Sequence, residues 1–144
     1  MSGDVTFRVF RGSPDSVGDP FGKMVDYTVE MDEGMVVLDV IHRIQAEHAP
    51  DLSCRWNCKA GKCGSCSAEV NGKPVLMCMT RMEDIMEETP EDVPVLVKPM
   101  QAFPLVKDLV TDVSWAYETD RSIAPINGPE EMDWEFKQEE ADRL

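Results

Sequence analysis

The feature that most constrains this chain is a group of five cysteines between residues 54 and 78, in the segment CRWNCKAGKCGSCSAEVNGKPVLMC. The chain has no other cysteine. An odd number of thiols cannot pair completely in disulfides, and close spacing of this kind suggests a metal or redox centre when the compartment is reducing. The fold must therefore bring several of these thiols together in space.

The rest of the sequence indicates a reducing compartment. The first ten residues, MSGDVTFRVF, alternate apolar with polar side chains and lack the apolar core of a signal peptide. No apolar run reaches the roughly 18 residues of a membrane-spanning helix. We therefore expect a cytoplasmic location, where thiols stay reduced. The net charge of −14 argues against nucleic acid as a partner, because phosphates require a basic surface.

Hydrophobic periodicity predicts an α+β fold. Residues 5–10 and 25–31 alternate apolar with polar side chains, so each is predicted to be a half-buried strand. The segment between them is rich in Gly, Pro, Ser and Asp, which predicts a hairpin with a long loop. Apolar residues at helical spacing in residues 36–48 predict a helix that ends before Pro50. Residues 93–99 predict one further short strand between two prolines.

The pattern changes at Pro104. Leu105, Leu109 and Val113 recur at four-residue intervals, which predicts a second helix beginning near residue 104. The last fifteen residues are strongly acidic, which fits either a solvated helix or a disordered linker, and we favour the linker.

A predicted hairpin explains how a distant cysteine reaches the others. Asn71 and Gly72 both tolerate the positive φ of a type I′ turn, which makes this pair a strong hairpin signal. A two-residue turn places Val70 opposite Lys73, and counting outward from that pair places Cys78 opposite Ser65. The hairpin thus delivers Cys78 to the loop that carries the other cysteines.

The spacing of the cysteines favours a binuclear iron–sulfur cluster. Cys58 precedes Cys63 by four intervening residues and Cys63 precedes Cys66 by two, which is the plant-type [2Fe–2S] spacing once Cys78 closes the set. Gly61 lies inside the longer interval. A binuclear centre needs backbone wrapped closely around its sulfides, which glycine allows.

The composition of the loop favours the same cofactor. Gly64 offers a second close approach of backbone N–H groups to sulfur. Between residues 54 and 66 the charged side chains are Arg55, Lys59 and Lys62, without any acid. A cluster with four thiolates carries a net charge of −2, or −3 when reduced. Local positive charge is expected to lower thiolate pKa values and to favour the reduced state, although these side chains could also be ordinary solvated loop charges.

The sequence also allows other assignments of the same residues. Cys54 could replace Cys58 as a ligand, lie behind the ligands as an extra thiol, or be a buried, inert cysteine. Four cysteines could also bind structural zinc, but zinc sites usually pair two short Cys-x₂₋₄-Cys units and Cys78 stands alone. His42 and His48 are not interleaved with the cysteines, which argues against a Rieske centre.

These motifs resemble a known family. The segment NCKAGKCGSC, the eleven-residue interval to Cys78 and the returning NGKPVLMC resemble the N-terminal domain of the iron–sulfur subunit of succinate dehydrogenase and fumarate reductase. The flanks VTFRVFR and PLVKDLVTDVSWAYETDRSI extend the resemblance over most of residues 4–124. In diffusible plant-type ferredoxins the fourth cysteine lies much farther downstream.

The resemblance implies a domain organisation and a cofactor. It implies a β-grasp [2Fe–2S] ferredoxin-like domain over residues 1–103, followed by a helical segment and acidic linker over residues 104–144. Cys58, Cys63, Cys66 and Cys78 match the family's cluster ligands. Further [4Fe–4S] and [3Fe–4S] clusters are expected only in a C-terminal iron–sulfur domain beyond this sequence.

The resemblance also implies a function. Members of the family pass electrons from a covalent FAD in a flavoprotein subunit, through this cluster, toward further clusters and a membrane quinone. The implied partners are that flavoprotein subunit, the C-terminal iron–sulfur domain and membrane anchor subunits, with the complex at the inner face of the cell membrane. We expect no catalytic residue and no turnover by this chain alone. The alternatives are a free [2Fe–2S] ferredoxin and a zinc-stapled interaction module.

Overall fold

A computed structural model of the chain describes residues 3–14 and 22–123, and it has the predicted α+β architecture. The strands are β1 (Gly3–Arg11), β2 (Lys23–Met31), β3 (Ser67–Val70), β4 (Lys73–Leu76), β5 (Val95–Lys98), β6 (Leu105–Lys107) and β7 (Val110–Thr111). The helices are α1 (Val37–Glu47), α2 (Met82–Glu88) and α3 (Ser114–Ser122).

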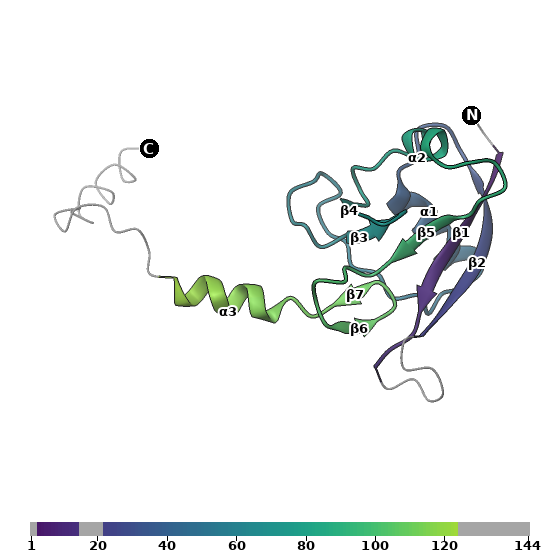
Figure 1. The fold of residues 1–144 in the computed structure, drawn as a ribbon. Coiled ribbons are helices and arrows are strands. Elements are labelled where there is room, and N and C mark those ends of the chain that lie inside the picture. The colour runs from purple at the N-terminus through teal and green to yellow at the C-terminus, as the bar shows by residue number, and fades with distance from the viewer. Residues whose placement is uncertain (1–2, 15–21, 124–144) are drawn as a thin grey trace, which may run out of the picture. The chain divides into compact units, whose positions relative to one another are not determined.

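Five of the strands form one mixed sheet in the order β2-β1-β5-β3-β4 (Figure 1). β1 pairs antiparallel with β2 and parallel with β5, which lies at the centre of the sheet. The predicted hairpin of β1 and β2 is confirmed, with Val5 opposite Val29. Val5, Phe7 and Val9 are all buried, as their alternation predicted.

Helix α1 packs its apolar side chains into the core of the domain. Leu38, Ile41 and Ile44 are essentially inaccessible to solvent, which confirms the predicted helix. The start of α1 is also bonded to the chain after β4: Val37 N–H donates to Thr80 O at 2.9 Å, and Leu38 N–H donates to Met77 O at 3.0 Å. These bonds fix the segment that contains Cys78 against the helix.

The region after β5 differs from the prediction. The helix predicted from residue 104 is wrong over its first part, because residues 105–111 form the two-stranded β6–β7 hairpin and α3 begins only at Ser114. Asp108 at the turn has a positive φ of 51°, which no helix accommodates. Leu109 is buried whereas Val106 is 45% exposed, so the apolar repeat reflects a strand hairpin in which Leu109 is the buried apolar residue. The short helix α2 was not predicted.

The chain divides into two compact units, residues 1–112 and residues 113–144. The β6–β7 hairpin therefore lies in the first of these units. The acidic segment interpreted as a linker lies outside the described residues. Among the described residues, no helix combines the length and apolar character that crossing a bilayer requires.

Candidate metal centre

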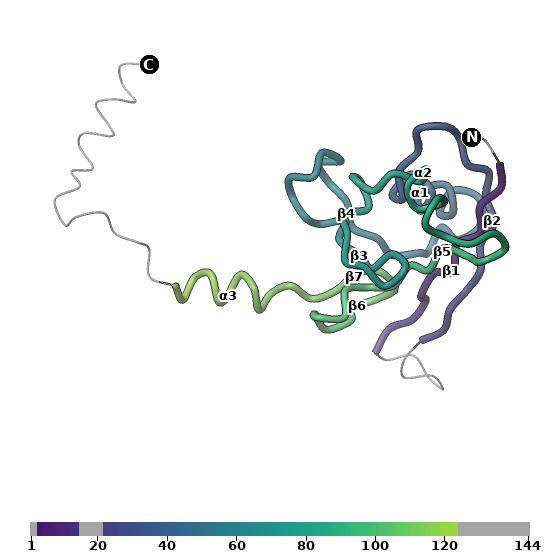
Figure 2. Tube along the Cα trace, turned by 45° about the horizontal axis from the view of Figure 1, so that its top comes forward, coloured from purple at the N-terminus to yellow at the C-terminus, as the bar shows by residue number. Residues whose placement is uncertain are grey.

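The cysteines gather where a long loop meets the β3–β4 hairpin. The loop leaves α1, passes beyond the β3–β4 end of the sheet and enters β3 directly after Cys66 (Figure 2). Asn71 and Gly72 form the predicted turn, with φ values of 50° and 81° and Val70 opposite Lys73. β4 then brings Cys78 back to Cys66, and the N–H of Cys78 lies 3.4 Å from the Cys66 sulfur. The predicted delivery of Cys78 to the loop is confirmed.

The four predicted ligands lie in two pairs. Cys66 and Cys78 are hydrogen-bonded neighbours, buried at 4% and 7% exposure as part of the hydrophobic core. Cys58 and Cys63 form the second neighbouring pair, in which Cys58 is half-buried and Cys63 is exposed. One pair is thus anchored in the core at the ends of the β3–β4 hairpin, and the other lies in the loop.

Backbone N–H groups converge on the loop sulfurs. Ala60, Lys62 and Cys63 each donate to the Cys58 sulfur, at 3.4, 3.3 and 3.3 Å respectively. The Ser65 N–H lies 3.5 Å from the Cys63 sulfur, and the Ser65 hydroxyl lies 3.0 Å from the same atom. Donors aimed at sulfur are what a negatively charged iron–sulfur cluster requires from its loop. The residues present therefore fit a [2Fe–2S] group.

Positive φ angles produce this convergence. Gly61 and Gly64 have φ values of 68° and 72°, in the left-handed region that favours glycine. A Cβ atom added to Gly61 would lie 2.9 Å from the Met79 Cγ atom, whereas one added to Gly64 would meet nothing within 4 Å. Gly61 thus allows a close approach between the loop and the segment after Cys78, and Gly64 provides a turn.

The two cysteine pairs have different electrostatic surroundings. Hydrogen bonding with the Cys58 backbone, followed by the hydroxyl and N–H of Ser65, lowers the pKa of the Cys63 thiol to about 6. Burial raises the pKa of Cys66 above its ordinary value. The lowered pKa at Cys63 arises from hydrogen bonds, and not from the basic side chains of the loop as its composition predicted.

Two of the three basic side chains of the loop, Arg55 and Lys59, have partners of their own. Arg55 Nη1 donates to the carbonyl of Thr111 at 2.9 Å. The Lys59 ammonium lies 4.5 Å from the centroid of the Trp56 ring, which is a cation–π distance. The side chain of Lys62 is exposed, and its backbone N–H is one of the donors to Cys58.

Cys54 differs from the other cysteines. It packs against the hydrophobic core and is partly buried, and its thiol lies 3.6 Å from the carbonyl oxygen of Arg55. Burial, together with the nearby Cys66, raises the pKa of Cys54 to about 12. At that pKa the Cys54 thiol stays protonated near neutral pH when no metal binds it. These surroundings support the interpretation of Cys54 as an inert cysteine.

The two histidines lie on and just after α1. The His42 ring contacts Trp56 edge-on, with centroids 5.1 Å apart, and His48 Nε2 lies 3.0 Å from the carbonyl of Thr28. Within residues 3–14 and 22–123, no three His, Cys, Asp or Glu side chains surround a point suited to a single metal ion. A binuclear cluster instead divides four thiolates between two irons, which matches the two cysteine pairs.

Sequence reasoning missed several residues that support the loop. Ser65 could have been found, because a hydroxyl residue between two closely spaced ligands is well placed to donate to sulfur. Asp108 carried no such signal. It lies far from the cysteines in sequence, yet its carboxylate accepts the Ser53 N–H at 2.9 Å, directly before the cysteine-rich segment.

Comparison with known proteins places the chain among iron–sulfur proteins. The 2Fe-2S iron-sulfur cluster binding domain family matches residues 6–118. The chain is 34% identical over 140 residues to a succinate dehydrogenase iron-sulfur subunit of Paracoccus denitrificans, covering 95% of this chain and 51% of that protein. It is 37% identical over 109 residues to a fumarate reductase iron-sulfur subunit of Wolinella succinogenes, covering 75% of this chain and 43% of that protein.

A solved structure also resembles this chain in sequence and in fold. A chain of the Mycobacterium smegmatis Sdh1 complex in the apo form shares 51% sequence identity and superposes with a TM-score of 0.80, over 93% of this chain and 52% of that one. The present chain thus spans about half the length of the curated relatives it matches.

Proposed function

Because the chain belongs to the 2Fe-2S iron-sulfur cluster binding domain family, we propose that Cys58, Cys63, Cys66 and Cys78 hold its [2Fe–2S] cluster. Cys58 and Cys63 would ligate one iron, and Cys66 and Cys78 the other. The support for this assignment is the arrangement of the four thiols in two neighbouring pairs. When bound, the cluster supplies a centre that gains and loses one electron.

The loop residues stabilise the negative charge of this centre. The three N–H groups on the Cys58 sulfur and the Ser65 hydroxyl beside Cys63 donate toward atoms that become more negative on reduction. Such hydrogen bonds favour the reduced state and raise the reduction potential. Gly61 and Gly64 serve the same purpose indirectly, because their positive φ values turn these N–H groups toward sulfur.

We propose that the chain relays electrons as part of a succinate:quinone oxidoreductase. The observation that carries this proposal is the short β3–β4 hairpin, which returns Cys78 to Cys66 and distinguishes the chain from free ferredoxins with a distant fourth cysteine. The named relatives are succinate dehydrogenase and fumarate reductase subunits. The cysteine pair at the surface suits electron exchange, since tunnelling requires a close approach between donor and acceptor.

The partners follow from the same proposal. An FAD-containing flavoprotein subunit would donate electrons, and a C-terminal iron–sulfur domain with membrane anchor subunits would accept them. Peripheral attachment to the inner face of the cell membrane would come from that assembly. We further propose that residues 1–103 are the core of the cluster-binding domain and that residues 104–144 lead toward the C-terminal domain.

The test uses the anaerobically reconstituted 144-residue chain. It should accept one electron from dithionite, and by itself neither oxidise succinate nor reduce a quinone analogue, because the family's relay needs a flavin on one side and further clusters on the other. Adding the flavoprotein subunit and a C-terminal iron–sulfur domain should produce succinate-dependent reduction of the cluster. Succinate oxidation by the chain alone would contradict the relay function, and a colourless zinc-containing chain would favour an interaction module.

A further inference from the structure

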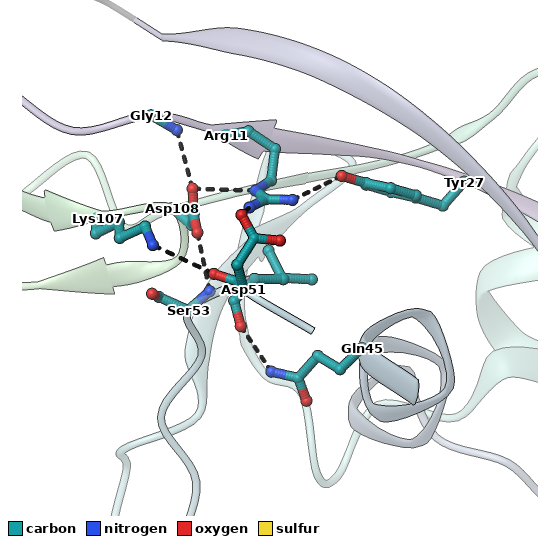
Figure 3. Close-up of polar contacts among 9 residues, drawn as sticks. Arg11, Gly12, Tyr27, Gln45, Asp51, Ser53, Lys107 and Asp108 are labelled. Carbon is teal, nitrogen blue, oxygen red and sulfur yellow. Dashed lines mark hydrogen bonds and ion pairs between the residues drawn. The ribbon is translucent and has the colours of Figure 1, made fainter. Parts of the chain in front are cut away.

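The turn of the β6–β7 hairpin contains a buried carboxylate that accepts two backbone hydrogen bonds and makes one ion pair. Asp108 is 1% exposed, and its two oxygens accept the N–H groups of Gly12 and Ser53, each at 2.9 Å (Figure 3). The Arg11 Nε atom lies 3.2 Å from the first of these oxygens as an ion pair. One side chain therefore joins the end of β1, the β6–β7 hairpin and the segment that leads into the cysteine-rich loop.

The hairpin holds this segment by more than one bond. Ser53 is fixed through both of its backbone groups, because its N–H donates to Asp108 and its carbonyl accepts the N–H of Leu109 at 3.2 Å. Two residues later, the Arg55 guanidinium donates to the carbonyl of Thr111. The chain is thus attached to the hairpin immediately before the first proposed ligand, Cys58.

The residues just before Ser53 are held as well. Arg11 donates to the Asp51 carboxylate at 2.7 Å, and Lys107 Nζ lies 3.3 Å from the Asp51 carbonyl. Gln45 of α1 donates to the Leu52 carbonyl at 2.7 Å. Figure 3 shows these contacts meeting around the same short stretch of chain. We call residues 51–55 with their partners the clamp.

The clamp is needed to position Cys58 and Cys63, because the hydrogen bonds around these two cysteines are mostly local. The donors to the Cys58 sulfur come from residues 60–63 of the same loop. They shape the loop but do not locate it relative to the sheet. The downstream end of the loop is fixed by the buried Cys66, directly before β3, and the upstream end is fixed by the clamp.

We propose that Asp108 is a positioning residue for the [2Fe–2S] cluster. Through the clamp it fixes the Cys58–Cys63 pair relative to the Cys66–Cys78 pair, which is anchored in the core. The two pairs must face the two irons of one cluster, so a displaced upstream end distorts the ligand geometry even when the rest of the domain is folded. This inference rests on the proposed ligand set.

The test compares Asp108→Ala and Asp108→Asn with Asp26→Ala in the cluster-loaded chain. Asp26 is a matched control, because it pairs with Arg8 through two bonds at 2.7 and 3.0 Å between β1 and β2 but is 46% exposed and outside the clamp. The readouts are the electron paramagnetic resonance g values of the reduced cluster, its visible circular dichroism, and the rate of cluster loss to an iron chelator. Far-ultraviolet circular dichroism reports whether each variant is folded.

We expect Asp108→Ala to shift the g values and the visible dichroism and to speed cluster loss by at least about tenfold, since the N–H groups of Gly12 and Ser53 lose their acceptor and Arg11 loses an ionic partner. Asp108→Asn should change the same readouts in the same direction but less, and Asp26→Ala should match the parent chain. If Asp108→Ala fails to fold, the g values and the rate of cluster loss of Asp108→Asn test the inference instead. Folded Asp108 variants with parental g values and parental cluster loss would overturn the inference.

The design separates this inference from the ligand assignment. A merely stabilising role for Asp108 would lower the unfolding temperature but leave the spectrum of the loaded molecules unchanged. Cys58→Ser is measured alongside. If Cys58→Ser loses the native cluster spectrum while both Asp108 variants behave as the parent, only the positioning role fails. If Cys58→Ser keeps that spectrum, the ligand assignment itself fails.

Discussion

Replacing Ser65 with alanine should lower the reduction potential of the cluster, because it removes a hydroxyl that lies 3.0 Å from the Cys63 sulfur. When that sulfur is a metal-bound thiolate it can only accept, so the hydroxyl must donate. The bond is present in both redox states. It is stronger in the reduced state, in which the cluster and its thiolates carry one more negative charge, so its loss disfavours reduction.

The size of the effect follows from the difference between the two states. A hydrogen bond to a charged group contributes about 1.5 to 3 kcal/mol net, against about 1 kcal/mol for a neutral pair. The added electron is shared over the cluster, so we assign a difference of about 1 kcal/mol to this one bond. Since a tenfold change in a one-electron equilibrium is about 59 mV, the expected fall is about 40 mV.

The assay is a redox titration of the reconstituted chain followed by electron paramagnetic resonance. Ser67→Ala is the matched control, because it removes a nearby serine hydroxyl that donates to the Gly64 carbonyl at 2.7 Å and not to sulfur. Ser65→Thr keeps a hydroxyl and should keep a potential close to that of the parent. A parental or higher potential in Ser65→Ala, or an equal fall in Ser67→Ala, would refute the reasoning.

Three further predictions concern the buried thiol, the core and the potential. Cys54 should resist iodoacetamide at pH 8 in the folded, loaded chain, because its pKa is raised to about 12 and the reactive thiolate forms only as the pH approaches that value; mass spectrometry showing rapid labelling would contradict this. Leu38→Ala should cost about 3 kcal/mol, since Leu38 is 1% exposed in the core beside the Cys78 segment, and an unchanged urea midpoint would count against it. The parent cluster should titrate well above the roughly −400 mV of plant-type ferredoxins, and a value near −400 mV would favour a free ferredoxin.

Local patterns predicted much of the fold because they report which side chains face the core. The alternation of Val5, Phe7 and Val9 identified β1, and the Asn71–Gly72 pair identified the hairpin and its register. The same reasoning failed after Pro104, where four-residue spacing suggested a helix. That hairpin is fixed by contacts with Arg11 and residues 51–55, and no local pattern encodes contacts with distant segments.

In the candidate site, too, local sequence predicted some residues, whereas others depend on contacts between distant segments. The cysteines and the glycines are adjacent in sequence, so their spacing alone predicted a shared loop. Asp108 and Ser53 are 55 positions apart, and their contact depends on the whole domain being folded. The packing of Cys54 against the hydrophobic core is likewise a tertiary property, although the spacing to Cys63 already favoured Cys58.

The central claim is that Cys58, and not Cys54, completes the set of cluster ligands. Visible absorption of Cys58→Ser and Cys54→Ser after anaerobic reconstitution tests it directly, with iron and sulfide determined on the same samples. We predict that Cys54→Ser keeps the red-brown spectrum of a [2Fe–2S] protein and that Cys58→Ser loses or alters it. A bleached Cys54→Ser beside a Cys58→Ser with the parental spectrum would contradict the account.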